Sequence, residues 1–400
     1  MAREASVYIH VPFCAGICDY CDFYSVPVKA GDPRLDRYVD MVLEDLEESL
    51  NESRVDRVPT VYIGGGTPSV LGAERLDRLL GGVTALLGGV PSGVAVSGGE
   101  AMREFTLEAN PESADPALLR LSRERGVTRL SLGAQTFHGI SRRAVHRAGD
   151  PVLLRERVAA AAAVFGEDLS LDLMTGLPYQ DEGILLQDMA TALSYKPGHV
   201  SLYALTLEEG TPLAEEAGKN GAALLEGDEA DRLWIAGRDA LEAAGYAQYE
   251  VSNFALPGRE SAHNTRYWLM KSWLGLGPGS SGTLIDEETG AGLRRTLKPD
   301  LDLWLNRGAS RKAPFVEEIL DRRILMEESI LMGFRRLEGP DPALFEARFR
   351  RPLQALIPRT LQRWEERVLL KTRPLALAQE GLLFLNAFLA EALSELPRAR

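Results

Sequence analysis

The sequence predicts an α/β protein: a partial parallel (β/α)6 barrel followed by a smaller C-terminal helical domain, which a winged fold would also fit. Three observations predict this class. Up to about residue 250, six short runs rich in β-branched and aromatic residues alternate with longer amphipathic segments. The 400 residues are 45% hydrophobic, enough for a large buried core. The polar motifs follow the ends of the expected strands.

Each expected strand is paired with a helical segment that is long enough to cross back over the sheet. The strands are expected at 6–11, 60–64, 105–110, 128–133, 169–174 and 199–205. The helices are expected near 34–51, 70–87, 115–125, 151–164, 182–195 and 227–244. Such crossovers join parallel strands, and chemistry then gathers where the strands end.

The pattern divides the chain into three parts. Residues 1–250 form the partial barrel, with a Gly-rich stretch at 86–100 that we interpret as a flexible surface insertion. Residues 251–310 are predicted to be a loop-rich connection. Residues 311–400 are predicted to form a small helical domain, with helices at 320–335, 342–349 and 352–368, a hairpin-like stretch and a last helix. Whether this domain covers the barrel mouth or binds a partner is left open.

Charge and cysteine content exclude several classes of protein. The net charge is −13, and only residues 310–400 are weakly basic, with 16 Lys and Arg against 13 Asp and Glu, so we expect no nucleic acid partner. We expect no transmembrane segment and no secretory leader, because no apolar run reaches about 20 residues. Three closely spaced cysteines exclude an intrachain disulfide framework and favour a reducing compartment. The expected location is the cytoplasm.

All three cysteines lie in one loop after the first expected strand. Cys14, Cys18 and Cys21 have the spacing C-x3-C-x2-C. Three thiolates can hold three irons of a [4Fe–4S] cluster, which leaves the fourth iron open to another ligand. A structural zinc site is the alternative, and it would need a fourth ligand such as His10 or Asp22.

A Gly-rich turn follows the second expected strand. It reads GGGTP at 64–68, and glycines let backbone groups approach a ligand closely, while Thr67 adds a hydroxyl. Alone, this turn could be any tight strand-to-helix connection. Beside an open iron, it suits a ligand that chelates through an amine and a carboxylate.

Five ordered motifs together resemble a known superfamily. The cysteine motif, preceded by YIHVPF, is followed by GGGTP, TLEANP, SLGAQTF and LDLMTGLP. This order resembles the radical S-adenosylmethionine (SAM) superfamily, and within it the porphyrin-biosynthesis branch of oxygen-independent coproporphyrinogen III oxidase and its HemW-type relatives. The resemblance covers nearly the whole chain.

The resemblance implies that SAM binds the open iron through its amine and carboxylate. An electron from a donor protein, passed through the cluster, then cleaves SAM to methionine and a 5′-deoxyadenosyl radical. It also implies cofactor-binding roles for a set of residues: Tyr8, Tyr20, Gly65, Gly66, Thr67, Glu108, Gln135, Arg147 and Asp172. An arginine suits a carboxylate, and acidic side chains suit an ammonium group or ribose hydroxyls. Without the motifs, Arg147 would be a solvated charge and Asp172 part of an interior ion pair.

Departures from the oxidase pattern favour the HemW-type haem chaperones. The oxidases resemble C-x3-C-x2-C-x-C, but this chain has Phe23 at the last position, and Cys14 lies too near the start for the oxidases' long N-terminal arm. HemW-type relatives have H-N-x-x-Y-W, and residues 263–268 read HNTRYW. The resemblance implies that haem binds there, with His263 as candidate ligand, and that haem passes to haem-accepting proteins. The alternatives are that His263 caps a turn and that the protein is a coproporphyrinogen III oxidase.

The other four histidines are expected to be structural or to lie on the surface. His10 falls inside the first strand and His199 opens the sixth. His138 and His146 are expected in the helix after the fourth strand.

Overall fold

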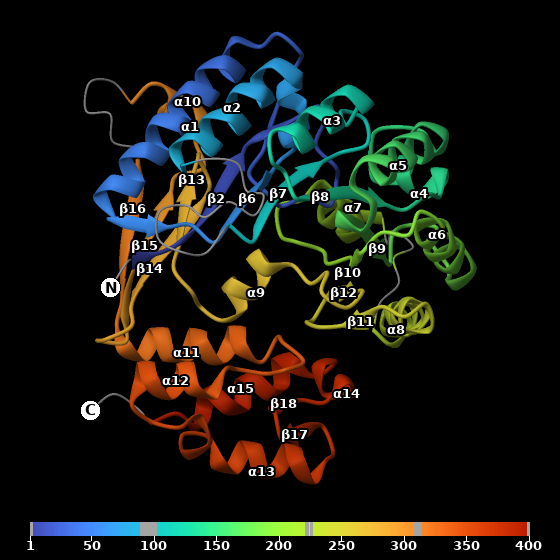
Figure 1. Ribbon diagram of the computed structural model, residues 1–400. Coiled ribbons are helices and arrows are strands. Elements are labelled where there is room, and N and C mark those ends of the chain that lie inside the picture. The colour runs from blue at the N-terminus through green and yellow to red at the C-terminus, as the bar shows by residue number, and fades with distance from the viewer. Residues whose placement is uncertain (1–2, 89–101, 221–223, 225–226, 308–313, 398–400) are drawn as a thin grey trace.

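A computed structural model describes residues 3–88, 102–220, 224, 227–307 and 314–397 of the chain. Its centre is a run of six neighbouring parallel strands (Figure 1). These strands are β2 (Ser6–Val11), β6 (Thr60–Gly65), β7 (Glu104–Ala109), β8 (Arg129–Gln135), β9 (Leu169–Thr175) and β10 (His199–Ala204). They coincide with the six predicted strands, so the α/β class with parallel strands is confirmed.

Helices follow each of these strands and line the outer side of the sheet (Figure 1). They are α1 (Pro33–Glu52), α2 (Gly72–Leu86), α3 (Pro116–Glu124), α5 (Pro151–Phe165), α6 (Glu182–Ser194) and α8 (Asp228–Ala243). Three of them begin with an Asp-Pro pair in which the aspartate accepts backbone hydrogen bonds: α1 at Asp32, α3 at Asp115 and α5 at Asp150. Each such cap stabilises its helix by about 1 kcal/mol, and the proline fits the first helical position.

The two faces of the parallel strands differ in polarity. On the face toward the helices, Val7, Ile9, Val61 and Ile63 are fully buried in the main core. Alternate residues point to the other, inner face, because side chains in a strand alternate. The inner face is polar and aromatic, with Tyr8, Tyr62, Glu108, Ser131 and Asp172. Three of these residues, Glu108, Ser131 and Asp172, line a pocket.

The segment 251–310 contains more strand than the loop-rich connection that the sequence predicted. Four strands within it extend the sheet: β12 (Asn253–Ala255), β13 (Trp273–Leu276), β14 (Ser281–Asp286) and β15 (Ala291–Leu297). Strand β13 runs parallel beside β2, and β14, β15 and β16 (Phe315–Leu320) continue antiparallel. With β11 (Ala247–Gln248) at the far end, the sheet has 12 strands, and its two edge strands, β11 and β16, do not pair with each other among the described residues.

Glycines explain why this extension was not foreseen. A Cβ atom on Gly275 would lie 2.3 Å from the carbonyl oxygen of Ser281, and one on Gly282 would lie 2.5 Å from the nitrogen of Gly275. Strands β13 and β14 therefore approach each other more closely than side chains permit. The same glycines read as loop signals in the sequence.

The C-terminal residues form a second apolar cluster of their own. It is built from α11 (Arg322–Gly333), α12 (Pro342–Phe349), α13 (Pro358–Glu366), the hairpin β17 (Leu370–Thr372) and β18 (Leu375–Leu377), α14 (Gln379–Leu382) and α15 (Leu385–Glu395). The predicted helices, hairpin and last helix are present, although 352–368 is a 3-10 turn followed by α13. The domain limits at residues 250 and 310 stay predictions.

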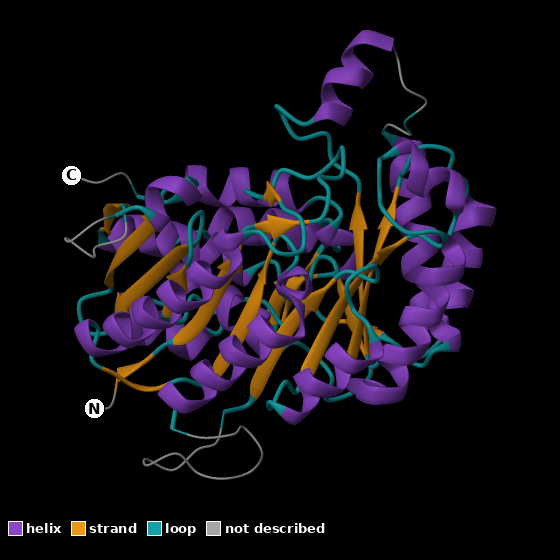
Figure 2. Cartoon of the chain, turned by 90° about the horizontal axis from the view of Figure 1, so that it is seen from above, coloured by secondary structure: helices purple, strands orange, loops and turns teal. Residues whose placement is uncertain are grey.

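The remaining short elements connect or flank the main ones. They are β1 (Arg3–Glu4), β3 (Phe13–Cys14), β4 (Val26–Pro27), β5 (Val55–Arg57), α4 (Gly139–Ala144), α7 (Pro212–Asn220), α9 (Ala262–Trp268) and α10 (Leu301–Leu305). Seen from above, the strands stand in a row with helices along their outer side (Figure 2). Most of the predicted insertion at 86–100 lies outside the described residues. No described helix is long and apolar enough to cross a membrane.

Candidate cofactor site

A pocket opens where the parallel strands end, on the inner face of the sheet. Its volume is about 330 Å³, within the range of about 300–1,000 Å³ that is usual for small-molecule sites. The lining includes the cysteine loop and the ends of β6 to β10, and among the predicted site residues it contains Cys14, Cys18, Cys21, Tyr20, Gly65, Gly66, Thr67, Glu108, Gln135, Arg147 and Asp172. The tertiary structure therefore brings together eleven of the predicted site residues from several distant parts of the sequence.

The cysteine loop is held at both ends by backbone hydrogen bonds. Strands β3 and β4 pair across it, and Val28 N donates to the carbonyl of Cys14 at 2.9 Å. Inside the loop, Cys21 N donates to the carbonyl of Cys18 at 3.1 Å. Burial raises the pKa of the Cys14 thiol, and it raises that of Cys21 to about 11. Thiols in such surroundings become thiolates when they bind metal ions.

All three cysteines line the pocket. Among the described residues, no three His, Cys, Asp or Glu side chains converge closely enough to hold a single metal ion. The three thiolates of a [4Fe–4S] cluster each bind a different iron, so they need not converge on one point.

The GGGTP turn lies against the base of the cysteine loop. Gly65 has φ +107°, and a Cβ on it would lie 2.6 Å from the His10 ring. A Cβ on Gly66 would lie 2.7 Å from the carbonyl oxygen of Phe13, whose strand leads into the loop. These two glycines are therefore required for close backbone approach. Thr67 is 2% exposed, and its hydroxyl lies 3.3 Å from the Cys14 sulfur.

Two carboxyl groups lie below this turn on the inner face. Glu108 accepts hydrogen bonds from Tyr62 Oη at 2.5 Å and from Gly65 N at 3.1 Å. Burial raises the pKa of Glu108 to about 7, and the nearby charge of Asp172 adds to the rise. Asp172 accepts from Ser131 Oγ at 3.1 Å, and burial raises its pKa too. These carboxyl groups can accept hydrogen bonds from an ammonium group or hydroxyls of a ligand.

Arg147 and Gln135 supply polar atoms that have no partner in the protein. Arg147 donates to Asn110 Oδ1 and to the Gly133 carbonyl, each at 2.7 Å, and its Nη1 lies 3.5 Å from the Cys18 sulfur. The Nε of Arg147 and the Oε1 of Gln135 are buried without a hydrogen-bond partner. Buried polar atoms without partners are costly, so these two point to a polar ligand. A donor and an acceptor beside three thiols fit the carboxylate and amine ends of an amino acid.

Tyr20 lines the pocket, whereas Tyr8 does not. Tyr8 lies deeper in the sheet, where its hydroxyl is 3.0 Å from His10 Nδ1, and burial raises its pKa well above the usual value. His10 Nε2 is in turn 2.9 Å from the Tyr24 carbonyl. In this structure Tyr8 therefore supports the base of the cysteine loop through His10. A direct contact of Tyr8 with a cofactor stays a prediction.

His263 lies at the opposite end of the strands from the cysteines. It is in α9, which lies between the sheet and the C-terminal helices (Figure 1), and it is 1% exposed. Its Nδ1 is 2.8 Å from the hydroxyl of Thr60, the first residue of β6, and the cofactor turn follows about 16 Å further along that strand. Burial lowers the pKa of His263 to about 3. His263 and the pocket are thus separate sites.

The tautomer of His263 follows from its neighbours. The Thr60 hydroxyl donates its one proton to Ser6 Oγ at 2.8 Å, so it accepts from His263 Nδ1. The Nε2 atom therefore has a free lone pair, and it is buried without a partner. Tyr62 and Tyr267 lie against the ring, with centroids 5.1 and 4.7 Å away. A free lone pair of this kind on a neutral imidazole can bind a metal ion.

Sequence reasoning placed Asn110 at the end of its strand but assigned it no cofactor role, and it misplaced two histidines. Asn110 joins two predicted residues, because its Nδ2 donates to Thr67 Oγ1 at 2.8 Å while its Oδ1 accepts from Arg147. Its position in TLEANP, directly after β7, was the available signal. His138 and His146 do not lie inside a helix: His138 directly precedes α4, and His146 follows its end, 2.6 Å from Asp19.

The C-terminal domain does not cover this pocket. No described residue beyond Tyr203 lines it. Instead the domain contacts α9 and the loop around Glu250, whose backbone bridges to Arg336. The lid that was left open as one role for this domain is therefore wrong for the conformation described.

Both the sequence and the fold are similar to those of known proteins. The model of the Radical SAM superfamily matches residues 8–190. The structure of "Coproporphyrinogen III oxidase (HemN) from Escherichia coli", described in its title as a radical SAM enzyme, matches with a TM-score of 0.80 at 18% identity, over 99% of this chain and 91% of that one. The fold and the pocket define a radical SAM protein, a superfamily that uses a [4Fe–4S] cluster and SAM.

Relatives narrow the assignment further. "Heme chaperone HemW" of Bacillus subtilis (strain 168) is 31% identical over 400 residues, covering 98% of this chain and 100% of that protein. The protein of the same name from Lactococcus lactis is 33% identical over 350 residues, covering 88% and 86%. "Radical S-adenosyl methionine domain-containing protein 1, mitochondrial" of Bos taurus is 34% identical, covering 84% and 74%. The chain belongs to the HemW family.

Proposed function

We propose that this protein is a haem-binding chaperone that holds a [4Fe–4S] cluster and SAM and delivers haem to acceptor proteins. The observation that carries the proposal is the relation to "Heme chaperone HemW" of Bacillus subtilis, which extends over 98% of this chain. The proposal includes an electron donor for the cluster. It places the protein in the cytoplasm, where free thiols stay reduced.

Cys14, Cys18 and Cys21 are the proposed cluster ligands. The turn at Gly65, Gly66 and Thr67 is proposed to bind the amine of SAM, and the partnerless Nε of Arg147 its carboxylate. When bound, the cluster supplies one electron and SAM supplies a radical. Glu108 keeps the turn in place, since it accepts a hydrogen bond from Gly65 N.

The lining of the pocket argues against the oxidase alternative. Coproporphyrinogen III has four propionates, and a site for it needs several cations. Among the described residues that line the pocket, Arg147 is the one cation, and it already contacts Asn110, Gly133 and Cys18. The lining also includes the acidic Asp22 and Glu108. A tetracarboxylate substrate would therefore meet negative charge.

His263 is proposed as the haem ligand, reached after α9 opens. Three features support it: the free lone pair on Nε2, the flanking rings of Tyr62 and Tyr267, and the position of α9 between two separate apolar clusters. A neutral imidazole is a common axial ligand of haem iron. Because burial lowers the pKa of His263 to about 3, protonation would not compete with iron near neutral pH.

The test is an anaerobic comparison of two activities in one reconstituted preparation. After reduction and addition of SAM, we expect haem to be retained and passed to an apo-haemoprotein, detected by the acceptor's Soret band. We expect no more coproporphyrinogen conversion than in a preparation without SAM. Rapid formation of protoporphyrinogen would refute the chaperone proposal and establish the oxidase.

A further inference from the structure

Strand β16 (Phe315–Leu320) forms one edge of the 12-stranded sheet. It pairs with β15 on one side, and no described strand pairs with it on the other. Its side chains are unusually exposed for apolar residues: Val316 is 59% exposed and Ile319 is 76% exposed. An open edge with apolar side chains can pair with an added strand.

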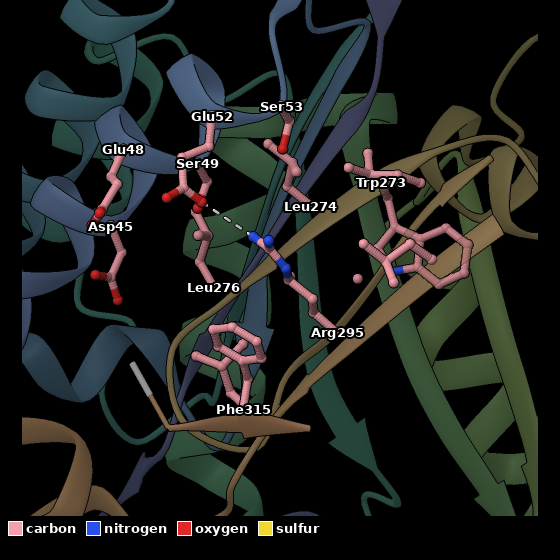
Figure 3. Close-up of a pocket in the computed structure, with 15 residues that line it drawn as sticks. Asp45, Glu48, Ser49, Glu52, Ser53, Trp273, Leu274, Leu276, Arg295 and Phe315 are labelled. Carbon is pink, nitrogen blue, oxygen red and sulfur yellow. Dashed lines mark hydrogen bonds and ion pairs between the residues drawn. The ribbon is translucent and has the colours of Figure 1, made fainter. Parts of the chain in front are cut away.

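A groove leads from this edge across the face of the sheet. It consists of two adjoining hollows, of about 90 Å³ and about 370 Å³, that share Glu52, Ser53, Leu284, Leu293 and Arg295. Helix α1 forms one wall, and the antiparallel strands form the floor (Figure 3).

The apolar floor of the groove continues to the open edge. Leu284, Leu293 and Ile319 lie opposite one another on β14, β15 and β16, so they form one row across three strands. Leu297 and Phe315 form a parallel row nearer the start of β16. A strand added to β16 would place alternate side chains beside both rows.

The surroundings of this row are acidic. Glu317 and Glu318 occupy the centre of β16, and both are exposed. On the groove side, Arg295 lies 3.3 Å from Glu52 of α1 (Figure 3). The same guanidinium group also lies 2.8 Å from Glu317. On the other side, Glu318 lies 3.7 Å from Arg294, which also pairs with Glu328 at 2.6 Å. On each side, at least two carboxylates share one guanidinium group.

This charge pattern selects against a second copy of the same chain. If two β16 strands paired antiparallel about Glu317, this residue would face its own copy, Val316 would face Glu318 and Phe315 would face Ile319, because facing side chains lie on the same side of a sheet. Pairing about Glu318 would likewise place Glu318 opposite its own copy. Like charges directly opposite each other are destabilising. A segment with basic residues at its centre and apolar residues on both sides would instead place a cation opposite each glutamate of β16 and an apolar side chain opposite each of its apolar residues.

We propose that β16 and the adjoining groove bind an extended segment of a partner protein, with adjacent Lys or Arg residues flanked by β-branched apolar residues. The segment adds to the sheet as an antiparallel strand. Its basic residues face Glu317 and Glu318, and its apolar residues extend the rows that end at Phe315 and Ile319. This surface lies on the sheet extension and is independent of the proposed haem function.

The test uses two synthetic peptides on the full-length protein. One has the core Ile-Val-Lys-Lys-Val-Ile, and the other has Glu in place of both Lys. We expect the lysine peptide to bind about tenfold more tightly by fluorescence anisotropy, because two cross-strand pairs change from like to opposite charge. We expect added salt to weaken binding, and hydrogen exchange to slow at residues 315–320 but not at the cofactor loop.

Variants separate this surface from general stickiness. Ile319→Lys should abolish peptide binding. Val152→Lys is the control, because it changes an apolar residue of α5 that is 66% exposed and lies away from this edge, and it should leave peptide binding unchanged. The double variant Glu317→Lys, Glu318→Lys should prefer the glutamate peptide. Equal binding of both peptides, or exchange protection elsewhere, would overturn the proposal. A dimer in sedimentation that Ile319→Lys dissociates would also overturn it, by assigning the edge to a second copy.

Discussion

Tyr62 donates a 2.5 Å hydrogen bond to Glu108, and this carboxyl group also accepts from the backbone of the cofactor turn at Gly65. The contact joins the buried inner face of the sheet to the turn that approaches the cysteine loop. Burial raises the pKa of Glu108 to about 7 even though the Tyr62 hydrogen bond acts in the opposite direction. The Glu108 carboxyl group, which supports the turn, therefore changes charge near neutral pH.

The first prediction is a dependence of stability on pH that is caused by Glu108. Its pKa is about 7 in the folded state against an ordinary value of 4.5, so the folded state holds the proton over a range where the unfolded state has lost it. The free energy of unfolding should therefore fall as pH rises from about 4.5 to about 7, by at most about 3 kcal/mol. Glu108→Gln should flatten this slope in urea unfolding of the cluster-free protein.

Glu250 provides the matched control for this experiment. Burial also raises its pKa to about 7, but it lies at the junction with the C-terminal domain. Glu250→Gln should remove the pH dependence of stability that Glu250 itself causes, and it should leave SAM binding unchanged. A Glu108→Gln protein with the full parental slope would contradict the prediction.

The second prediction concerns Asn110, which bridges Thr67 and Arg147. Asn110→Ala should weaken SAM binding about tenfold, because the Thr67 hydroxyl and the Arg147 guanidinium each lose a partner that fixes their position. Cluster absorbance should not change. Equilibrium dialysis of the reconstituted protein measures the affinity. Ser113→Ala is the control, since Ser113 contacts Ser69 nearby but does not line the pocket.

The third prediction concerns the cysteine loop. Single changes of Cys14, Cys18 or Cys21 to Ala should abolish the visible absorbance and the reduced-state electron paramagnetic resonance signal of the cluster, because an iron loses its thiolate. Phe23→Ala, in the same loop and 65% exposed, should retain both signals. A full signal in any one of the cysteine variants would remove that residue from the ligand set.

The fourth prediction separates a haem ligand from a structural histidine. His263→Ala should weaken haem binding and shift the Soret band, because the proposed axial ligand is lost. Thr60→Val removes the hydrogen-bond partner of His263 but keeps the imidazole. Both variants should lower the free energy of unfolding by about 1–3 kcal/mol. If His263→Ala and Thr60→Val weaken haem binding equally and neither shifts the Soret band, the prediction is wrong and His263 acts only by supporting α9.

The order of strands and helices up to residue 250 was predictable because each element is long enough to show its own period. Strand β9, for example, reads LSLDLMT, with leucines toward the helices and Asp172 toward the inner face. Prediction failed from 251 to 320. There β13 has only four residues, and its Gly275 approaches Gly282 of β14 at a distance that a sequence does not reveal.

The sequence by itself determined the cysteine loop, the glycine turn and the polar residues that close each strand, because these depend on local spacing and on motif order. Only the tertiary structure decided how the motifs relate in space. Parallel pairing places Glu108 under Gly65 and Arg147 beside Cys18, and it leaves Tyr8 and His263 outside the pocket. It also decided that HNTRYW lies in a half-buried helix at the far end of the strands, with His263 as its buried residue. A strand has two ends and two faces, and which of them a residue occupies depends on pairing partners far away in the chain.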